Sequence, residues 1–128
     1  MTQAMIPTVF QVALGGAIGA AARYGVGVAL FRPTGAFPLG VLTVNVLGSF
    51  VMGLLVVYLG QRMMLHLNPF LMTGVLGGFT TFSAFSLEAY TLFERGDVGL
   101  AALYVGLSVG LSIAALIAGV LIMRGVLA

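Results

Sequence analysis

The sequence predicts an all-α integral membrane protein with four transmembrane helices, of which the third is broken near its middle. Hydrophobic residues make up 61% of the 128 positions and charged residues only 6%, whereas a soluble domain averages roughly 25% charged residues. The chain also divides into four apolar runs, each close to the about 20 residues that a helix needs to cross a bilayer. We therefore treat residues 1–128 as one transmembrane domain.

The predicted spans are separated by short joints, so consecutive helices should run antiparallel. They cover residues 8–31, 39–60, 70–93 and 98–123. All four prolines fall at the joints, where three open a helix, a position that tolerates the missing N–H, and one ends the first span. Pro7, Pro38 and Pro69 open helices, and Pro33 ends the first span.

Residues that favour helix ends mark the remaining boundaries. Asn68 directly precedes Pro69 and is expected to cap the third helix, as Asp97 is expected to cap the fourth. Gly96 suits the end of the third helix, because glycine adopts the left-handed conformation common there. Small residues at four-residue spacing, such as Gly15 with Gly19, predict close packing between helices.

Four of the five arginines lie outside the predicted spans, and they are balanced across the membrane; the fifth, Arg23, lies within the first span. Arg62 and Arg124 share one side of the membrane, while Arg32 and Arg95 share the other. A Lys/Arg imbalance normally sets orientation, and here there is none. The balance could arise by chance. Alternatively, the chain inserts in both orientations and pairs with its own inverted copy. A second chain would then supply the inverted two-fold axis that many transporters use, because this sequence contains no internal repeat.

The remaining composition excludes several classes of protein. The arginines are scattered, which argues against a nucleic-acid-binding patch. With no cysteine, one histidine and three acidic residues, the chain has too few ligands for a side-chain metal cage. No nucleophile–base pair or acidic cluster indicates an enzyme.

The third span contains a weak point near mid-membrane. Gly77 and Gly78, followed by Thr80 and Thr81, disfavour a continuous helix, since each glycine costs about 1 kcal/mol relative to alanine. A break there would leave carbonyl groups without partners in hydrocarbon. Either a small cation held between carbonyl oxygens or a threonine hydroxyl bonded back to the chain would satisfy them.

Rings and hydroxyls alternate through the same span. Lipid-facing rings and self-bonded hydroxyls explain such residues individually, but their density exceeds what packing requires. Ring edges are positive and hydroxyls donate hydrogen bonds, so together they favour a path for an anion. The rings are Phe79, Phe82 and Phe85, and the hydroxyls beside them are Thr80, Ser83 and Ser86.

Two further polar residues lie within apolar spans. Asn45 stands in the second span, near Thr43, and Arg23 stands in the first, where a charge is expensive. A clamp between helices would explain Asn45, and snorkelling or pairing with Glu88 would explain Arg23. For both we favour a direct role in function.

The fourth span carries its own polar face. Ser108 and Ser112 lie one helical turn apart, with Tyr104 a turn earlier. Helix packing explains each serine taken alone. Together with the third span they extend the predicted path.

These residues resemble a known family. The run GGFTTFSAFSLE at residues 77–88 is similar to the third-helix signature of the small bacterial fluoride channels called Fluc or CrcB. AARYG in the first span, TVNVLGS in the second and the serine-bearing fourth span extend the resemblance over the whole chain.

The resemblance implies an antiparallel, dual-topology homodimer in the bacterial inner membrane, with two fluoride pathways and a structural sodium ion at its centre. Gly77 and Thr80 would offer backbone carbonyls to the sodium ion. Phe82 and Phe85 would line the pore, with Asn45 as a polar donor beside them. Further pathway hydroxyls would come from Thr81, Ser83, Ser108 and Ser112.

Three other positions complete the comparison with the family. Arg23 would attract the anion from an aqueous vestibule, and Glu88 matches the acidic residue that closes the third-helix motif. Several relatives carry a threonine where this chain has Leu116, so the pathway departs from the family pattern there. The resemblance assigns no role to Tyr104.

The predicted function is passive export of fluoride to relieve its toxicity, without an enzymatic step. One alternative is a small dual-topology exporter of cationic drugs, which would need a carboxylate deep in the membrane, and Glu88 lies near the end of its span. Another is a non-conducting membrane assembly subunit. That alternative leaves the rings and hydroxyls of the third span unexplained.

Overall fold

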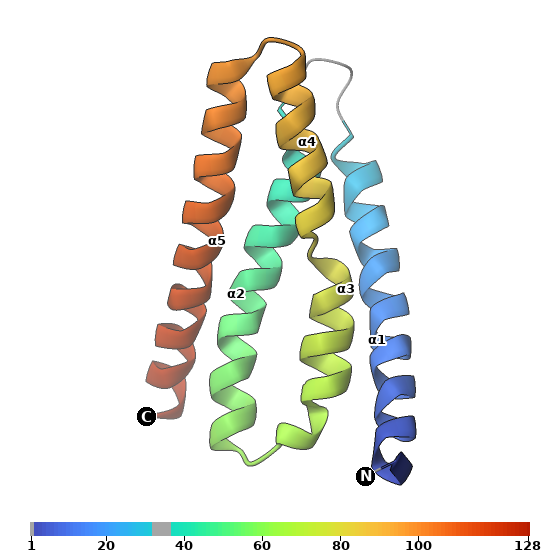
Figure 1. The fold of residues 1–128 in the computed structure, drawn as a ribbon. Helices are drawn as coiled ribbons and strands as arrows, with labels where there is room; N and C mark the ends of the chain where they lie inside the picture. Colours follow the sequence, from blue (N-terminus) through green and yellow to red (C-terminus); the bar gives the residue numbers. More distant parts are fainter. Residues whose placement is uncertain (1, 32–36) are drawn as a thin grey trace.

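The chain forms four helical segments that are long and apolar enough to cross a membrane, as the sequence predicts (Figure 1). The computed structural model describes residues 2–31 and 37–128. The helices are α1 (Thr2–Ala29), α2 (Leu39–Gln61), η1 (Leu65–Leu67), η2 (Pro69–Leu76), α3 (Gly77–Phe79), α4 (Phe82–Glu94) and α5 (Val98–Leu127). The third crossing comprises η1 to α4, and η2 within it is a π-helix.

The prolines occupy the predicted positions with one exception. Pro38 precedes the first residue of α2 and Pro69 is the first residue of η2, as expected. Pro7 does not open α1, because the helix begins at Thr2 and contains the proline. So close to the helix start, the missing N–H removes a single hydrogen bond. Pro33, predicted to end the first span, and Arg32 lie outside the described residues.

The end of α4 is a glycine-dependent cap, as predicted. Gly96 has a φ of +88°, a conformation that glycine adopts without steric cost. Its N–H donates to Phe93 O (3.0 Å), and the N–H of Asp97 donates to Leu92 O (3.0 Å). These two bonds form a Schellman motif, which turns the chain from α4 into α5.

The two predicted side-chain caps do not form. Asn68 precedes η2 with helical backbone angles and makes no capping bond with its side chain, because a residue already in the helical conformation does not present its side chain to the following N–H groups. Asp97 occupies the N-cap position of α5, but it too makes no side-chain capping bond. Its carboxylate instead pairs with the Arg95 guanidinium at 3.3 Å.

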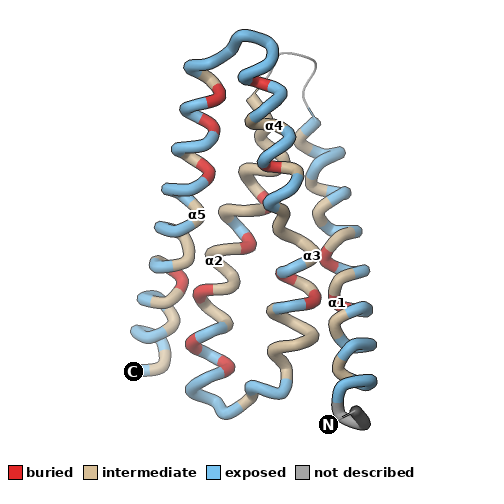
Figure 2. Tube along the Cα trace, viewed as in Figure 1, coloured by how far each residue is buried: buried red, intermediate tan, exposed pale blue. Residues whose placement is uncertain are grey.

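Consecutive crossings run antiparallel, so both termini and the turn after α2 lie at one end of the molecule (Figure 1). α2 packs chiefly on α5, and α1 packs on η2 and α3. Several of the small residues predicted to mediate packing do so: a Cβ on Gly15 would overlap Phe70 O, one on Gly19 would overlap Val75 O, and Gly53 and Gly119 are equally close to the helix opposite. Gly106 and Gly110, predicted to act in the same way, have nothing within 4 Å of a Cβ among the described residues. α1 and α5 are otherwise mostly exposed along their length (Figure 2).

The third crossing is broken near its middle, as predicted, and the break lies at the two threonines that follow the glycine pair. Gly77 has helical angles (φ −62°, ψ −37°), and the extended residues are Thr80 (φ −90°, ψ 159°) and Thr81 (φ −152°, ψ 126°). Gly78 instead serves packing, because a Cβ there would lie 2.6 Å from Gly16 O of α1. The break therefore follows the glycines and lies near the middle of the crossing.

Candidate functional site

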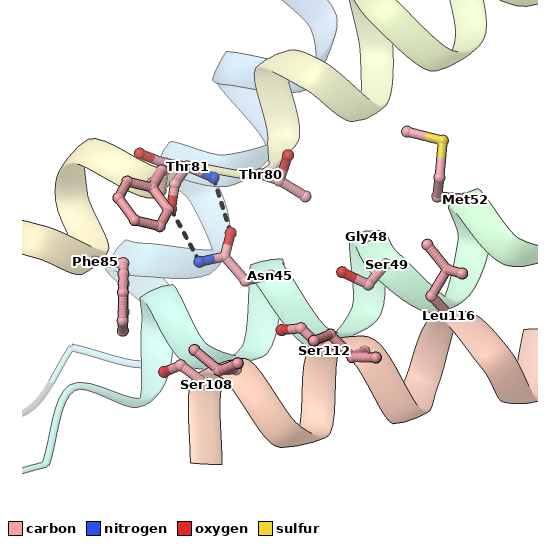
Figure 3. Close-up of a pocket in the computed structure, with 13 residues that line it drawn as sticks. Asn45, Gly48, Ser49, Met52, Thr80, Thr81, Phe85, Ser108, Ser112 and Leu116 are labelled. Carbon is pink, nitrogen blue, oxygen red and sulfur yellow. Dashed lines mark hydrogen bonds between the residues drawn. The ribbon is translucent and has the colours of Figure 1, made fainter. Parts of the chain in front are cut away.

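Asn45 of α2 satisfies the backbone at the break. Its Nδ2 donates to Thr81 O at 2.9 Å, and the N–H of Thr81 donates to its Oδ1 at 2.8 Å (Figure 3). In hydrocarbon an unpaired backbone group costs several kcal/mol, so this reciprocal pair removes that penalty for one extended residue. Asn45 is thus a clamp between two crossings, and its direct role in function stays a prediction.

Threonine hydroxyls satisfy the neighbouring groups. Thr80 Oγ1 donates to Leu76 O at 2.9 Å, the self-bonded arrangement considered as one outcome of a break. Thr81 Oγ1 accepts the N–H of Ala84 at 3.1 Å and so caps α4. It also lies 3.3 Å from Ser83 Oγ. The second half of the crossing therefore restarts as a helix immediately after the break.

Arg23 reaches the same break from α1. Its Nε donates to Gly78 O at 3.0 Å, a carbonyl in the last turn of α3 that has no further helical N–H to accept. Within residues 2–31 and 37–128 the ion pair is Arg95 with Asp97, so Arg23 and Glu88 are not paired. Arg23 therefore supports the end of α3 with a charged donor.

A cavity of about 450 Å³ lies beside the break, between α2, α4 and α5 (Figure 3). It brings together six of the seven residues predicted for an ion pathway. These are Asn45, Thr81, Phe82, Phe85, Ser108 and Ser112. The seventh, Ser83, is outside the lining but contacts the Thr81 hydroxyl.

The two phenylalanine rings that line the cavity differ in how far they are buried. Phe85 is buried, with 9% of its surface exposed, whereas Phe82 is 78% exposed. Their ring centroids are 5.4 Å apart in an edge-on arrangement, and Phe85 also lies 5.4 Å from Tyr104. Phe79 does not join them in one stripe, because the extended residues intervene and its ring would instead meet a Cβ on Gly48 at 3.4 Å.

The hydroxyls of the third and fourth crossings differ in their hydrogen bonding. Ser86 donates to Phe82 O at 2.9 Å, as an ordinary helical serine does. The oxygens of Ser108 and Tyr104 are buried and have no hydrogen-bond partner among the described residues. Ser108 lines the cavity, so its donor is available to a bound ligand.

The cavity contains residues that the sequence analysis did not select. Ser49 and Met52 of α2 and Ile113 of α5 line it, beside Leu116, the position at which the sequence departs from the family pattern. The signal for Ser49 was present, because it follows Asn45 by four residues and so shares its helical face. Thr43, by contrast, lines a separate apolar groove between α2 and α5.

Arg23 lines a second cavity of about 520 Å³, on the α1 side of α2. Thr81 belongs to the lining of both cavities. The guanidinium thus lies in a space adjoining the break. The aqueous vestibule beside this charge stays a prediction.

A cation at the break would depend on backbone oxygens. The described residues contain no group of three or more His, Asp or Glu side chains that could hold a metal. The carbonyls of Gly77 and Thr80 lie at and beyond the last turn of α3, where the i+4 N–H of a continuing helix is missing. Unwound carbonyls of this kind are the usual ligands of Na⁺ in transporters, so the residues present fit the predicted ion.

Comparisons with known proteins agree with this architecture. Residues 10–120 match the family described as CrcB-like protein, Camphor Resistance (CrcB). The chain is 65% identical to the fluoride-specific ion channel FluC of Ruegeria sp. (strain TM1040), over 96% of this chain and 99% of that protein. It is 62% identical to the protein of the same name from Cereibacter sphaeroides (strain ATCC 17029 / ATH 2.4.9), over 94% and 98%. The chain therefore belongs to the CrcB family.

Proposed function

We propose that this chain forms a fluoride-selective channel, which exports F⁻ passively across the bacterial inner membrane as a multi-pass protein. The observation that carries the proposal is the cavity at the break, which gathers six of the seven predicted pathway residues. The names of relatives that are 62% to 65% identical support fluoride as the ion. They do not favour a drug exporter or an assembly subunit.

Passage of fluoride through the cavity requires several hydrogen-bond donors. Moving a bare small anion into an apolar medium costs tens of kcal/mol, and one charge-assisted hydrogen bond returns about 1.5–3 kcal/mol. Several donors in succession are therefore needed, none holding the ion too firmly. Asn45 retains a second amide N–H beyond the one given to Thr81, and the Ser108 hydroxyl is unpartnered.

Net export of fluoride requires no energy source within the protein. Fluoride enters a cell as neutral HF, ionises in the less acidic interior and leaves through the pore down its own gradient. Arg23 lines the cavity that adjoins Thr81, where its positive charge raises the local anion concentration. Glu88 makes no ion pair with any described residue, and we assign it no step in conduction.

The channel we propose is an antiparallel homodimer with a structural Na⁺. One chain offers two carbonyl oxygens, from Gly77 and Thr80, and an inverted copy would offer two more. The balanced arginines support insertion in both orientations. The Na⁺ would hold the two broken crossings together and add positive potential near the anion path.

Anion efflux from liposomes containing the purified protein tests the function. With a K⁺ gradient and valinomycin setting the membrane potential, we expect rapid F⁻ efflux recorded with a fluoride electrode. Chloride-loaded vesicles should show no efflux above that of protein-free vesicles. Equal release of both halides, or no fluoride release, would reject the proposal.

A further inference from the structure

The structure places Ser49 in the cavity, although the family resemblance assigned this residue no role. It lies on α2 one turn beyond Asn45 and lines the same cavity as Ser112 of α5 (Figure 3). We propose that the Ser49 hydroxyl is a further anion-binding position, which acts with Ser112 at the end of the cavity farther from Asn45. This inference rests on the proposed function.

The first argument is the hydrogen bonding of hydroxyls in the helices. Ser86 and Thr91, outside the cavity, and Thr80, which lines it, each donate to the carbonyl four residues earlier, at 2.9 Å, 2.8 Å and 2.9 Å. Ser49 and Ser112 line the cavity, and neither side-chain hydroxyl makes a hydrogen bond with another described residue. A serine that does not bond back to its helix keeps its donor for a ligand.

The second argument is the composition of this end of the cavity. α2 and α5 run in the same direction (Figure 1), so the lining passes from Asn45 and Ser108 towards Met52 and Leu116. Met52 and Leu116 carry no hydrogen-bond donor. An anion in this part of the cavity therefore has the hydroxyls of Ser112 and Ser49 as its side-chain donors.

The third argument is that close backbone packing determines where Ser49 lies. Gly53, one turn beyond Ser49, contacts Leu116 O so closely that a Cβ would overlap it, and Gly119 packs on Phe50 O in the same way. These contacts set the register between α2 and α5. Because no large side chain separates the helices there, Ser49 is held beside Ser112 and Leu116.

Substitution at Ser49 tests the proposal. In the liposome assay, Ser49→Ala should slow F⁻ efflux about tenfold, equivalent to about 1.4 kcal/mol. Ser49→Thr keeps a hydroxyl and should stay within about twofold of the wild type, a change of about 0.4 kcal/mol. Ser86→Ala is the matched control and should conduct as the wild type does, because its hydroxyl is bonded to Phe82 O.

A second substitution separates ion contact from helix packing. Leu116→Thr, introduced into Ser49→Ala, places a donor at the same end of the cavity and should restore several-fold of the lost flux. Full conduction by Ser49→Ala would overturn the inference, and so would equal loss in Ser49→Thr with an altered size-exclusion profile. A wild type that passes no fluoride would instead reject the proposed function.

Discussion

The carboxamide of Asn45 and the main chain of Thr81 exchange two hydrogen bonds, of 2.9 Å and 2.8 Å, across two membrane crossings. A side chain thereby takes the place of the helical partners that Thr81 lacks. This lets the third crossing remain extended for two residues in a medium that offers no water. The break is consequently a stable feature of the fold, on which the geometry of the neighbouring cavity depends.

Removing this pair should destabilise the protein. Asn45→Leu deletes both bonds, so we expect a loss of about 2 kcal/mol at about 1 kcal/mol per bond, with loss of fluoride flux. Asn45→Asp keeps the acceptor but sets a carboxylate against Thr81 O and the anion, and should abolish flux. Thermal unfolding followed by size exclusion measures the first effect. Thr43→Ala, in the separate groove of α2, is the control and should leave both quantities unchanged.

The two rings of the cavity should separate stability from conduction. Phe82 is 78% exposed, so Phe82→Ile should change stability by less than about 0.5 kcal/mol. Phe85 is buried against Tyr104, and Phe85→Ile should cost about 1 kcal/mol. Both should lower fluoride flux about tenfold or more, a barrier increase of about 1.4 kcal/mol. Phe93→Ile, outside the cavity lining, should conduct normally, and unchanged flux in Phe82→Ile would contradict a role for that ring.

Close contact between α1 and α3 should make Gly78 intolerant of any side chain. The Cβ of Gly78→Ala would lie 2.6 Å from Gly16 O and 3.0 Å from Gly16 Cα, and such overpacking typically costs 1–3 kcal/mol. Gly125→Ala is the control, because nothing lies within 4 Å of its Cβ, and it should gain up to about 1 kcal/mol. Melting temperatures of the two variants should therefore move in opposite directions. Equal changes in the melting temperatures of the two variants would show that the contact between Gly78 and Gly16 is not tight.

Insertion in both orientations is measurable because the chain contains no cysteine. Gln61→Cys and Glu94→Cys place single thiols at exposed helix ends, the end of α2 and the end of α4, which lie at opposite ends of the molecule (Figure 1). With balanced arginines, about half of each variant should react with a membrane-impermeant maleimide from outside the cell. Full reaction of one variant and none of the other would show a single orientation. Lysed cells, in which both should react completely, provide the control.

Sodium should stabilise the assembled protein. Synthesis into nanodiscs without Na⁺, with N-methylglucamine as the cation, should give a lower melting temperature. Added Na⁺ should restore it, since ligand at 100 times its Kd contributes about 2.7 kcal/mol. Potassium at equal concentration is the control for ionic strength. Identical melting with and without Na⁺ would exclude the carbonyl site at Gly77 and Thr80.

Local composition was sufficient to predict most of the fold. Apolar length determines the four crossings, and Gly96 determines the end of α4, because both depend on neighbouring residues alone. The predictions of side-chain caps at Asn68 and Asp97 were wrong because residue type alone does not determine a cap. Each depends on local backbone angles and on competing partners, such as Arg95 for Asp97, which the residue type does not specify.

For the site, the sequence alone determined which residues are unusual in a membrane, and therefore that Asn45, Arg23 and the residues of the third crossing matter. Only the tertiary structure decided where the crossing breaks and what each polar group does. Whether a backbone group can be left outside a helix depends on the donors opposite it, and Arg23 and Asn45 come from 55 and 36 residues away in the chain. Long-range packing also places the neighbouring segments, because Gly78 packs on Gly16 beside the break and Gly53 packs on Leu116 one turn beyond Ser49.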